Sequence, residues 1–139
     1  MQSPNDEINA LDTTWSWQSK VTASYRAPRG IQLSTFWQGL SGAPGQRTYV
    51  FRSVPQSSTV MVRMEPFGAR KLPALHSVNF RVAKRLTLAR MRVDLSTDIY
   101  NLFNVNTATG TTYAAGPSFG AITGILSPRV ARVGATVSF

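Results

Sequence analysis

Apolar and polar residues alternate at every second position over several stretches of this chain. In residues 14–26 one side carries apolar and small residues, and the other carries Lys, Arg, Ser, Thr and Gln. A period of two predicts β-strand, because successive side chains of a strand point to opposite faces. The same pattern returns in residues 31–40, 76–86, 91–103 and 130–139. The chain is therefore predicted to be all-β, with about five main strands.

Tight turns and long loops alternate between these strands. Residues 27–30 contain Pro and Gly, and residues 87–90 separate two strands closely, so both are predicted to be tight turns. Residues 40–75 hold four prolines and two short β-like stretches, which predicts a long loop with a small hairpin of its own. Residues 104–128 are predicted to be a second long loop, although residues 119–129 also suit a short strand. The result is an antiparallel up-and-down meander with both turns at one end.

A soluble β-sandwich and an outer-membrane β-barrel both produce this alternation, and strand length separates them. The apolar face is the core of a sandwich, whereas in a barrel it meets lipid and the polar face lines the lumen. The alternation in residues 14–26 and 91–103 runs for about 13 residues, against about 5–6 in most globular sheets and about 9–11 in a membrane strand. This length favours the barrel. Its lumen-facing polar residues would be Lys20, Arg81, Asp94, Asp98 and Arg132, and its interfacial aromatic girdle would be Trp15, Trp17, Tyr25 and Trp37.

The charge of the chain raises a second hypothesis. The 139 residues include 15 Lys and Arg against 6 Asp and Glu, a net charge of +9. A soluble basic β-domain could bind nucleic acid or polysaccharide by stacking aromatic side chains on its ligand. The aromatic residues of the first strand alternate away from Lys20 and Arg26, however, which favours lipid as their neighbour. Residues 1–13 are polar and are expected to be a disordered or loop lead-in to a β segment that spans residues 14–139.

The sequence offers little catalytic chemistry. It has no cysteine and one histidine, His76, so no set of thiolates or histidines is present to bind a metal ion. Neither a nucleophile elbow nor a phosphate-binding loop occurs, and no enzyme activity and no cofactor are expected. Asp94 and Asp98 could hold a calcium ion or a sugar, since they share a strand face. Pairing with an arginine across the hairpin, Arg81 or Arg85, is favoured instead.

Two motifs near the end of the chain carry a resemblance to a known family. One is the run Asn101, Leu102, Phe103 and Asn104; the other is "FGAITGILSPR" followed by a last strand that ends in an aromatic residue. This pattern resembles the C-terminal end of TonB-dependent outer-membrane receptors, and most of all the Oar-like subset. The resemblance is strong over residues 75–139 and looser over residues 14–74. In such proteins the last strand carries a signal for assembly, which here would be Phe139, Val137, Ala135 and Val133.

The resemblance implies a large barrel of about 22 strands with an N-terminal plug in its lumen. Such a receptor imports large substrates across the outer membrane of a Gram-negative cell, driven by the TonB energising complex, which acts on a short N-terminal box. This chain contains neither a plug nor that box, so it is expected to be a C-terminal barrel segment that is inactive by itself. The implied partners are outer-membrane lipid, the missing plug and barrel strands, the TonB complex through the absent N-terminus, the barrel assembly machinery and an unknown imported substrate.

Overall fold

The computed structural model describes residues 11–54, 57–88 and 90–139, which divide between two compact units. The sheet unit comprises Gln18–Gly39, His76–Asn106 and Ser127–Phe139. The loop unit comprises residues 11–17, Leu40–Leu75 and Thr107–Leu126, apart from the gap at residues 55–56. The described residues form β-strands and one short 3₁₀ turn, so the prediction of an all-β chain with antiparallel sheets is confirmed. No helix in this part of the chain is long and apolar enough to cross a membrane.

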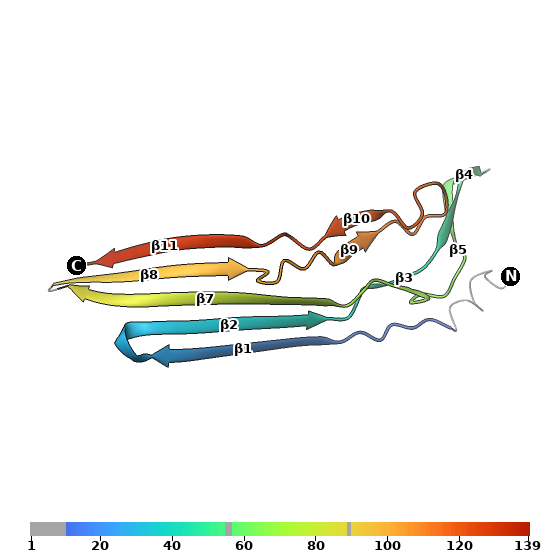
Figure 1. Cartoon of the computed structure of the whole chain (residues 1–139). Coiled ribbons are helices and arrows are strands. Elements are labelled where there is room, and N and C mark those ends of the chain that lie inside the picture. Colours follow the sequence, from blue (N-terminus) through green and yellow to red (C-terminus); the bar gives the residue numbers. More distant parts are fainter. Residues whose placement is uncertain (1–10, 55–56, 89) are drawn as a thin grey trace. The chain divides into compact units, whose positions relative to one another are not determined.

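The sheet unit is an antiparallel meander of five strands. These are β1 (Gln18–Ala27), β2 (Ile31–Leu40), β7 (Leu75–Leu88), β8 (Met91–Tyr100) and β11 (Val130–Ser138). They lie in the order β1-β2-β7-β8-β11, so that each main strand pairs with its neighbours along the chain, and β1 and β11 form the two edges. Figure 1 shows the strand directions alternating across the sheet. The sheet is open and does not close on itself within the described residues.

Two of these strands are shorter than the alternation predicts. The first begins at Gln18. The Ser41 N–H donates to the Trp17 carbonyl at 2.9 Å, but the Trp17 N–H donates to the side-chain Oγ of Ser41 at 3.1 Å and not to a backbone carbonyl. The fourth ends at Tyr100, because Asn101 has a positive φ of 51° that breaks the extended backbone. A period of two in the sequence therefore overestimates strand length where local hydrogen bonding redirects the chain.

The tight turn between β1 and β2 depends on its glycine. Gly30 has a φ of +74°, a conformation that side chains with a Cβ rarely adopt. A Cβ there would lie 2.7 Å from the backbone oxygen of Arg85, so the neighbouring strand β7 leaves no room for one. Arg29, the preceding residue, is also left-handed, with a φ of 64°. The turn is thus formed by two successive left-handed residues, and only one of them is a glycine.

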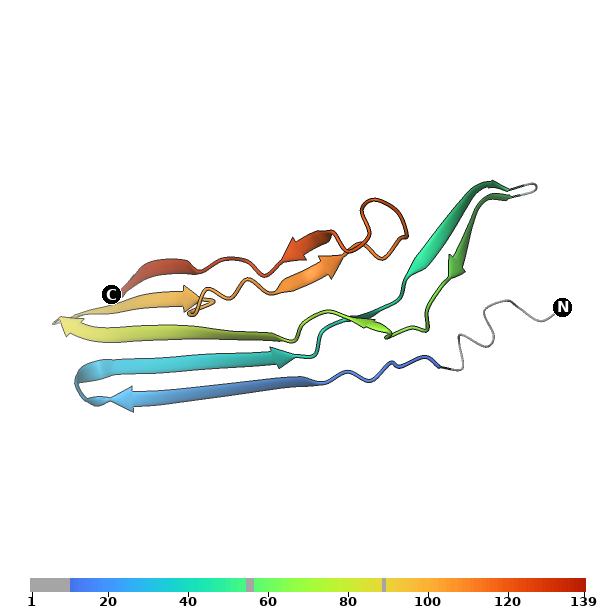
Figure 2. The ribbon, with the colours of Figure 1, turned by 45° about the vertical axis from the view of Figure 1, so that its right-hand side comes forward.

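The loop unit consists of three small two-stranded sheets. Both predicted long loops contain hairpins, which Figure 2 shows as separate pairs of arrows. In the first loop β3 (Pro44–Gly45) pairs with β6 (Arg70–Lys71), and β4 (Thr48–Val54) pairs with β5 (Ser57–Arg63), as expected for its small hairpin. In the second loop β9 (Ala108–Thr111) pairs with β10 (Ile122–Ile125). The prediction of unbroken loop over residues 104–118 was therefore wrong at β9, where threonines favour extended backbone.

The described residues contain no buried hydrophobic side chain. The residues that are buried there are three polar ones, Thr48, Asp98 and Asn101, together with a few glycines. In contrast, Val133 is 80% exposed and Phe139 is 97% exposed. A water-soluble sheet normally covers its apolar face with a second layer, so this sheet presents the reverse of ordinary burial.

Candidate functional site: the charged face and the asparagine turn

Charged side chains lie in rows across one face of the sheet unit. The register sets Arg81 of β7 and Arg132 of β11 directly opposite Asp98 of β8. The Asp98 carboxylate accepts from Arg132 Nη2 at 2.9 Å and lies 3.5 Å from Arg81 Nε, and its side chain is only 8% exposed. Three predicted lumen-facing residues therefore meet in one cluster, which joins three adjacent strands. We call it the Asp98 cluster.

A second row of the same face holds Asp94. Its carboxylate accepts from Arg85 Nε at 2.7 Å, and the two residues are directly opposite in the register. The predicted pairing of these aspartates with arginines across the hairpin is confirmed: Arg85 forms an ion pair with Asp94, and Arg81 forms one with Asp98. Arg81 and Asp94 share the charged face, as their alternation in the sequence predicts, but Asp94 pairs with Arg85 and not with Arg81, because Arg81 lies four positions away in the register. Both carboxylates form ion pairs with arginine guanidinium groups. The described residues contain no cluster of three or more His, Asp or Glu side chains that could hold a metal ion.

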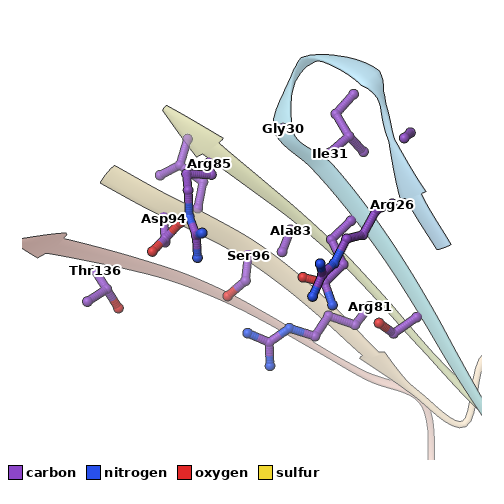
Figure 3. A pocket seen from close by; sticks show the side chains of 13 residues that line it. Arg26, Gly30, Ile31, Arg81, Ala83, Arg85, Asp94, Ser96 and Thr136 are labelled. Atoms are coloured by element: carbon purple, nitrogen blue, oxygen red, sulfur yellow. Dashed lines mark hydrogen bonds and ion pairs between the residues drawn. The ribbon is translucent and has the colours of Figure 1, made fainter. Parts of the chain in front are cut away.

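Three arginines surround a groove of about 800 Å³ on this face. Figure 3 shows Arg26, Arg81 and Arg85 projecting to the same side of the sheet as Asp94, and Ser96 and Thr136 also line the groove. Arg26 makes no ion pair within the described residues, so this face carries more positive than negative charge. Lys20, the fifth predicted lumen residue, lies six positions before Arg26 on β1 and therefore shares its side of the strand. Lys20 is exposed and stands apart from the Asp98 cluster.

Asn101 organises the backbone where β8 ends. Its side chain Nδ2 donates to the carbonyls of Val105 and Ser127 at 2.8 Å each, and its Oδ1 accepts from the Val105 N–H at 2.9 Å. Its own N–H donates to Asn79 Oδ1 at 3.0 Å. Asn101 is 5% exposed and left-handed, a conformation in which asparagine is several-fold enriched. One side chain thereby connects the end of β8 to the residues that precede β11.

The rest of the predicted motif completes this turn. Asn104 is also left-handed, with a φ of 53°, and its Oδ1 accepts from the Arg129 N–H at 2.9 Å. The Leu102 N–H donates to the Val78 carbonyl at 2.8 Å, while Phe103 points outward and is 71% exposed. The sequence singled out Asn101, Leu102, Phe103 and Asn104 only through a family resemblance. The structure gives the two asparagines a physical role, because each combines a positive φ with a long-range hydrogen bond.

The apolar face carries the predicted assembly residues and half of the predicted aromatic girdle. Alternation along β11 puts Val133, Ala135, Val137 and Phe139 on the side opposite the Asp98 cluster. Trp37 stacks on His76 with ring centroids 5.9 Å apart, and Tyr25 is 64% exposed near the other end of the sheet. These two aromatic residues therefore lie toward opposite ends of the sheet unit, as the residues of two interfacial girdles would.

The other two predicted girdle residues belong to the loop unit. Trp15 is 67% exposed, and the Lys71 ammonium lies 5.2 Å from its ring centroid. The Trp17 N–H donates to Ser41 Oγ at 3.1 Å. Neither residue lies in β1, so the four aromatics predicted as one girdle are divided between the two units.

An ion pair and backbone hydrogen bonds hold the start of the described chain against the rest of the loop unit. The Asp12 carboxylate accepts from Arg63 Nη2 and from the Phe67 N–H, both at 2.6 Å. The hydrogen bond from Arg63, followed by that from Phe67, lowers the pKa of Asp12 below its usual value. Likewise, the hydrogen bond from Arg70 lowers the pKa of Glu65. Of the predicted lead-in, residues 1–10 lie outside the described residues, whereas residues 12–13 are held by these contacts and by the Thr13 N–H, which donates to the Phe67 carbonyl.

Neither a protein-family model, nor a curated protein, nor a solved structure matches this chain significantly. Function is therefore inferred from the sequence motifs and from the two faces of the sheet unit. Sequence reasoning named Arg85 among the possible partners of Asp94 but missed Asn79 as a partner of Asn101, because that contact depends on the register of neighbouring strands. The alternation of residues 76–86 identified the face on which they lie, but it could not identify which residues meet.

Proposed function

We propose that this chain is the C-terminal part of a transmembrane β-barrel in the outer membrane of a Gram-negative cell. Its apolar face contacts lipid, and its charged face lines the lumen. The motifs around Asn101 and the last strand resemble those of TonB-dependent receptors of the Oar-like subset, which import large substrates. By this proposal the chain supplies five strands of such a transporter and has no transport activity alone.

The uncovered apolar face carries this proposal. Two opposite burial patterns meet in one sheet: no hydrophobic side chain of the described residues is buried, whereas the side chain of Asp98 is 8% exposed. In water, an uncovered apolar face of this extent is unfavourable by about 25 cal/mol for each Å² of exposed apolar surface. Lipid removes this cost without a second protein layer, and a lumen accommodates the charged rows opposite.

Strand length and unpaired edges support the same proposal. Four of the five main strands have 9 or 10 residues, within the about 9–11 that a tilted membrane strand needs, and β7 is longer, with 14 residues. The edge strands β1 and β11 each leave one row of backbone groups without a strand partner in the described residues. Lipid cannot satisfy those groups, so further barrel strands would have to pair with both edges.

The alternative of a soluble basic β-domain also has an observation in its favour. The groove beside Arg26, Arg81 and Arg85 is cationic, and an anionic chain could lie along it. Binding of nucleic acid or polysaccharide usually adds aromatic stacking on the same face. Tyr25 and Trp37 lie on the apolar face instead, away from these arginines, so the barrel remains the better account.

Solubility without detergent distinguishes the two proposals. The chain, refolded from denaturant into buffer or into detergent micelles, is analysed by sedimentation velocity and by circular dichroism. The barrel proposal predicts aggregation in buffer and a dispersed β-rich species only in micelles, since the apolar face needs cover. A monodisperse β-rich monomer in plain buffer would overturn it, and binding of a polyanion by that monomer would establish the alternative.

A further inference from the structure

Positive charge gathers at the end of the sheet unit where the two tight turns lie, which we call the turn end. The register and the contact of Gly30 with Arg85 bring the β1–β2 and β7–β8 turns to this same end. Asp94 is the one Asp or Glu side chain at this end among the described residues, and it pairs with Arg85. The remaining cationic residues at this end have no ion pair within the described residues, and they are Arg26, Arg29, Lys84, Arg90 and Arg92.

A small groove at the turn end combines two of these arginines with apolar side chains. It has a volume of about 320 Å³ and is lined by Thr87, Arg90, Met91, Arg92, Ser138 and Phe139. The end of β11 lies beside the start of β8, and the end of β7 lies on the other side of β8, as Figure 1 shows. Thr87 and Ser138 both pair with Arg92 and so share the charged face, whereas Met91 alternates to the apolar face. The groove therefore extends around the end of the sheet from one face to the other.

The apolar side of this groove is open to its surroundings. Phe139 is 97% exposed, Met91 39%, and the neighbouring Leu88 59%. Lys84 projects from the same apolar face, directly opposite Leu95 in the register. A lysine in such a position can lay its carbon chain along apolar surface while its ammonium reaches a polar layer. A cationic rim thus borders apolar side chains at this end of the sheet.

We propose that this groove binds the headgroup of an anionic phospholipid. Arg90 and Arg92 would hold the phosphate, for which guanidinium groups are well suited, and Met91 and Phe139 would contact the adjoining carbons of the lipid. The inference rests on the proposed function, because it requires the apolar face to lie in a membrane. An acidic polypeptide could satisfy the two arginines, but it would leave the exposed Phe139 ring without apolar cover. The paired cationic and apolar lining therefore favours a lipid.

Lipid titration in detergent tests the inference. The full 139-residue chain in non-ionic micelles is titrated with short-chain phosphatidylglycerol or with phosphatidylcholine, and bound lipid is counted by native mass spectrometry. We expect selective binding of phosphatidylglycerol. Arg90→Gln and Arg92→Gln should each weaken it roughly 5-fold and the double variant roughly 25-fold. Arg52→Gln, which removes a charge from the β4–β5 hairpin outside this groove, should leave it unchanged, and about 1 M salt should abolish the selectivity.

Three outcomes would overturn the inference. Equal binding of the two lipids would do so, as would unchanged binding by a double variant that keeps the wild-type circular dichroism spectrum. Displacement of the lipid by an equal concentration of inorganic phosphate would also do so, since it would assign the groove to free phosphate. In each case a chain that still requires detergent leaves the proposed function standing. A chain that is monomeric in buffer contradicts the proposed function itself.

Discussion

Replacing Asn101 with alanine should open the turn that joins β8 to the residues before β11. The substitution removes two donors and one acceptor, which leaves the carbonyls of Val105 and Ser127 and the Val105 N–H without these partners. Alanine must also adopt the left-handed backbone, with φ near 51°, which asparagine tolerates better. The change therefore affects hydrogen bonding and backbone strain together.

The expected magnitude follows from these contacts. Three hydrogen bonds at about 1 kcal/mol each and about 1 kcal/mol of backbone strain give a local destabilisation of about 3–4 kcal/mol. Because about 1.4 kcal/mol corresponds to a factor of ten, the Val105 amide should exchange with solvent roughly 10²- to 10³-fold faster. Asn101→Gly should recover the strain contribution but not the hydrogen bonds, since glycine accepts a positive φ. Its amide exchange should fall between those of the wild-type chain and the alanine variant.

Hydrogen exchange of the folded chain, followed by NMR or by mass spectrometry of a peptide that contains Val105, measures this effect. Asn106→Ala is the matched control, because Asn106 is exposed and makes no side-chain hydrogen bond within the described residues. We expect the control to exchange like the wild-type chain at Val105. If Asn101→Ala also exchanged like the wild-type chain, the proposed role of Asn101 as the organiser of this turn would be refuted.

Three further predictions concern other contacts. Asp98→Ala should lower the free energy of unfolding by about 1–3 kcal/mol, because Arg81 and Arg132 both lose their shielded carboxylate partner. Asp94→Ala should lower it by less than about 1 kcal/mol, because the Asp94–Arg85 pair is exposed, and equal urea midpoints for the two variants would contradict this ranking. Because the pKa of Asp12 is lowered in the folded chain, its pairing stabilises the loop unit above about pH 4, and this stabilisation is lost as pH falls through the folded-state pKa. The Phe67 amide should therefore lose protection from hydrogen exchange below about pH 4 in the wild-type chain but not in Asp12→Asn. In the full-length protein, Phe139→Ala should reduce the heat-modifiable, protease-resistant fraction in outer-membrane preparations at unchanged synthesis. Unaltered levels of that fraction would remove Phe139 from the assembly signal.

Much of the sheet could be predicted from the period of two. Alternation identified the five main strands, the turn at residues 27–30 and the two faces, because a strand with one polar and one apolar side specifies its register strongly. The ends of strands were less predictable. Residues 14–17 continue the alternation but lie outside β1, where the Trp17 N–H donates to the Ser41 side chain. Residues 101–103 lie outside β8 because Asn101 is left-handed. Such departures depend on contacts with residues more than twenty positions away.

The candidate site was predictable as a face and not as a set of contacts. Arg81, Asp98 and Arg132 were assigned to one side of the sheet from parity alone, and they meet because the register aligns them in one row. The groove at the turn end was not foreseen, since Arg90 and Phe139 are 49 positions apart in the numbering and only strand pairing brings them together. The register between strands that are distant in the sequence exists only in the folded chain, so a local sequence pattern cannot predict it.

The central claim is that the apolar face of the sheet lies against lipid. The chain has no cysteine, so single cysteines along β11 can be labelled with an environment-sensitive fluorophore without other changes. The barrel account predicts that labels at Val133, Ala135 and Val137, in chain reconstituted into phosphatidylcholine vesicles, are quenched by brominated lipid. Labels at Thr136 and Ser138 should instead be quenched by aqueous iodide. Equal iodide quenching at all five positions, or an alternation of the opposite phase, would contradict the account.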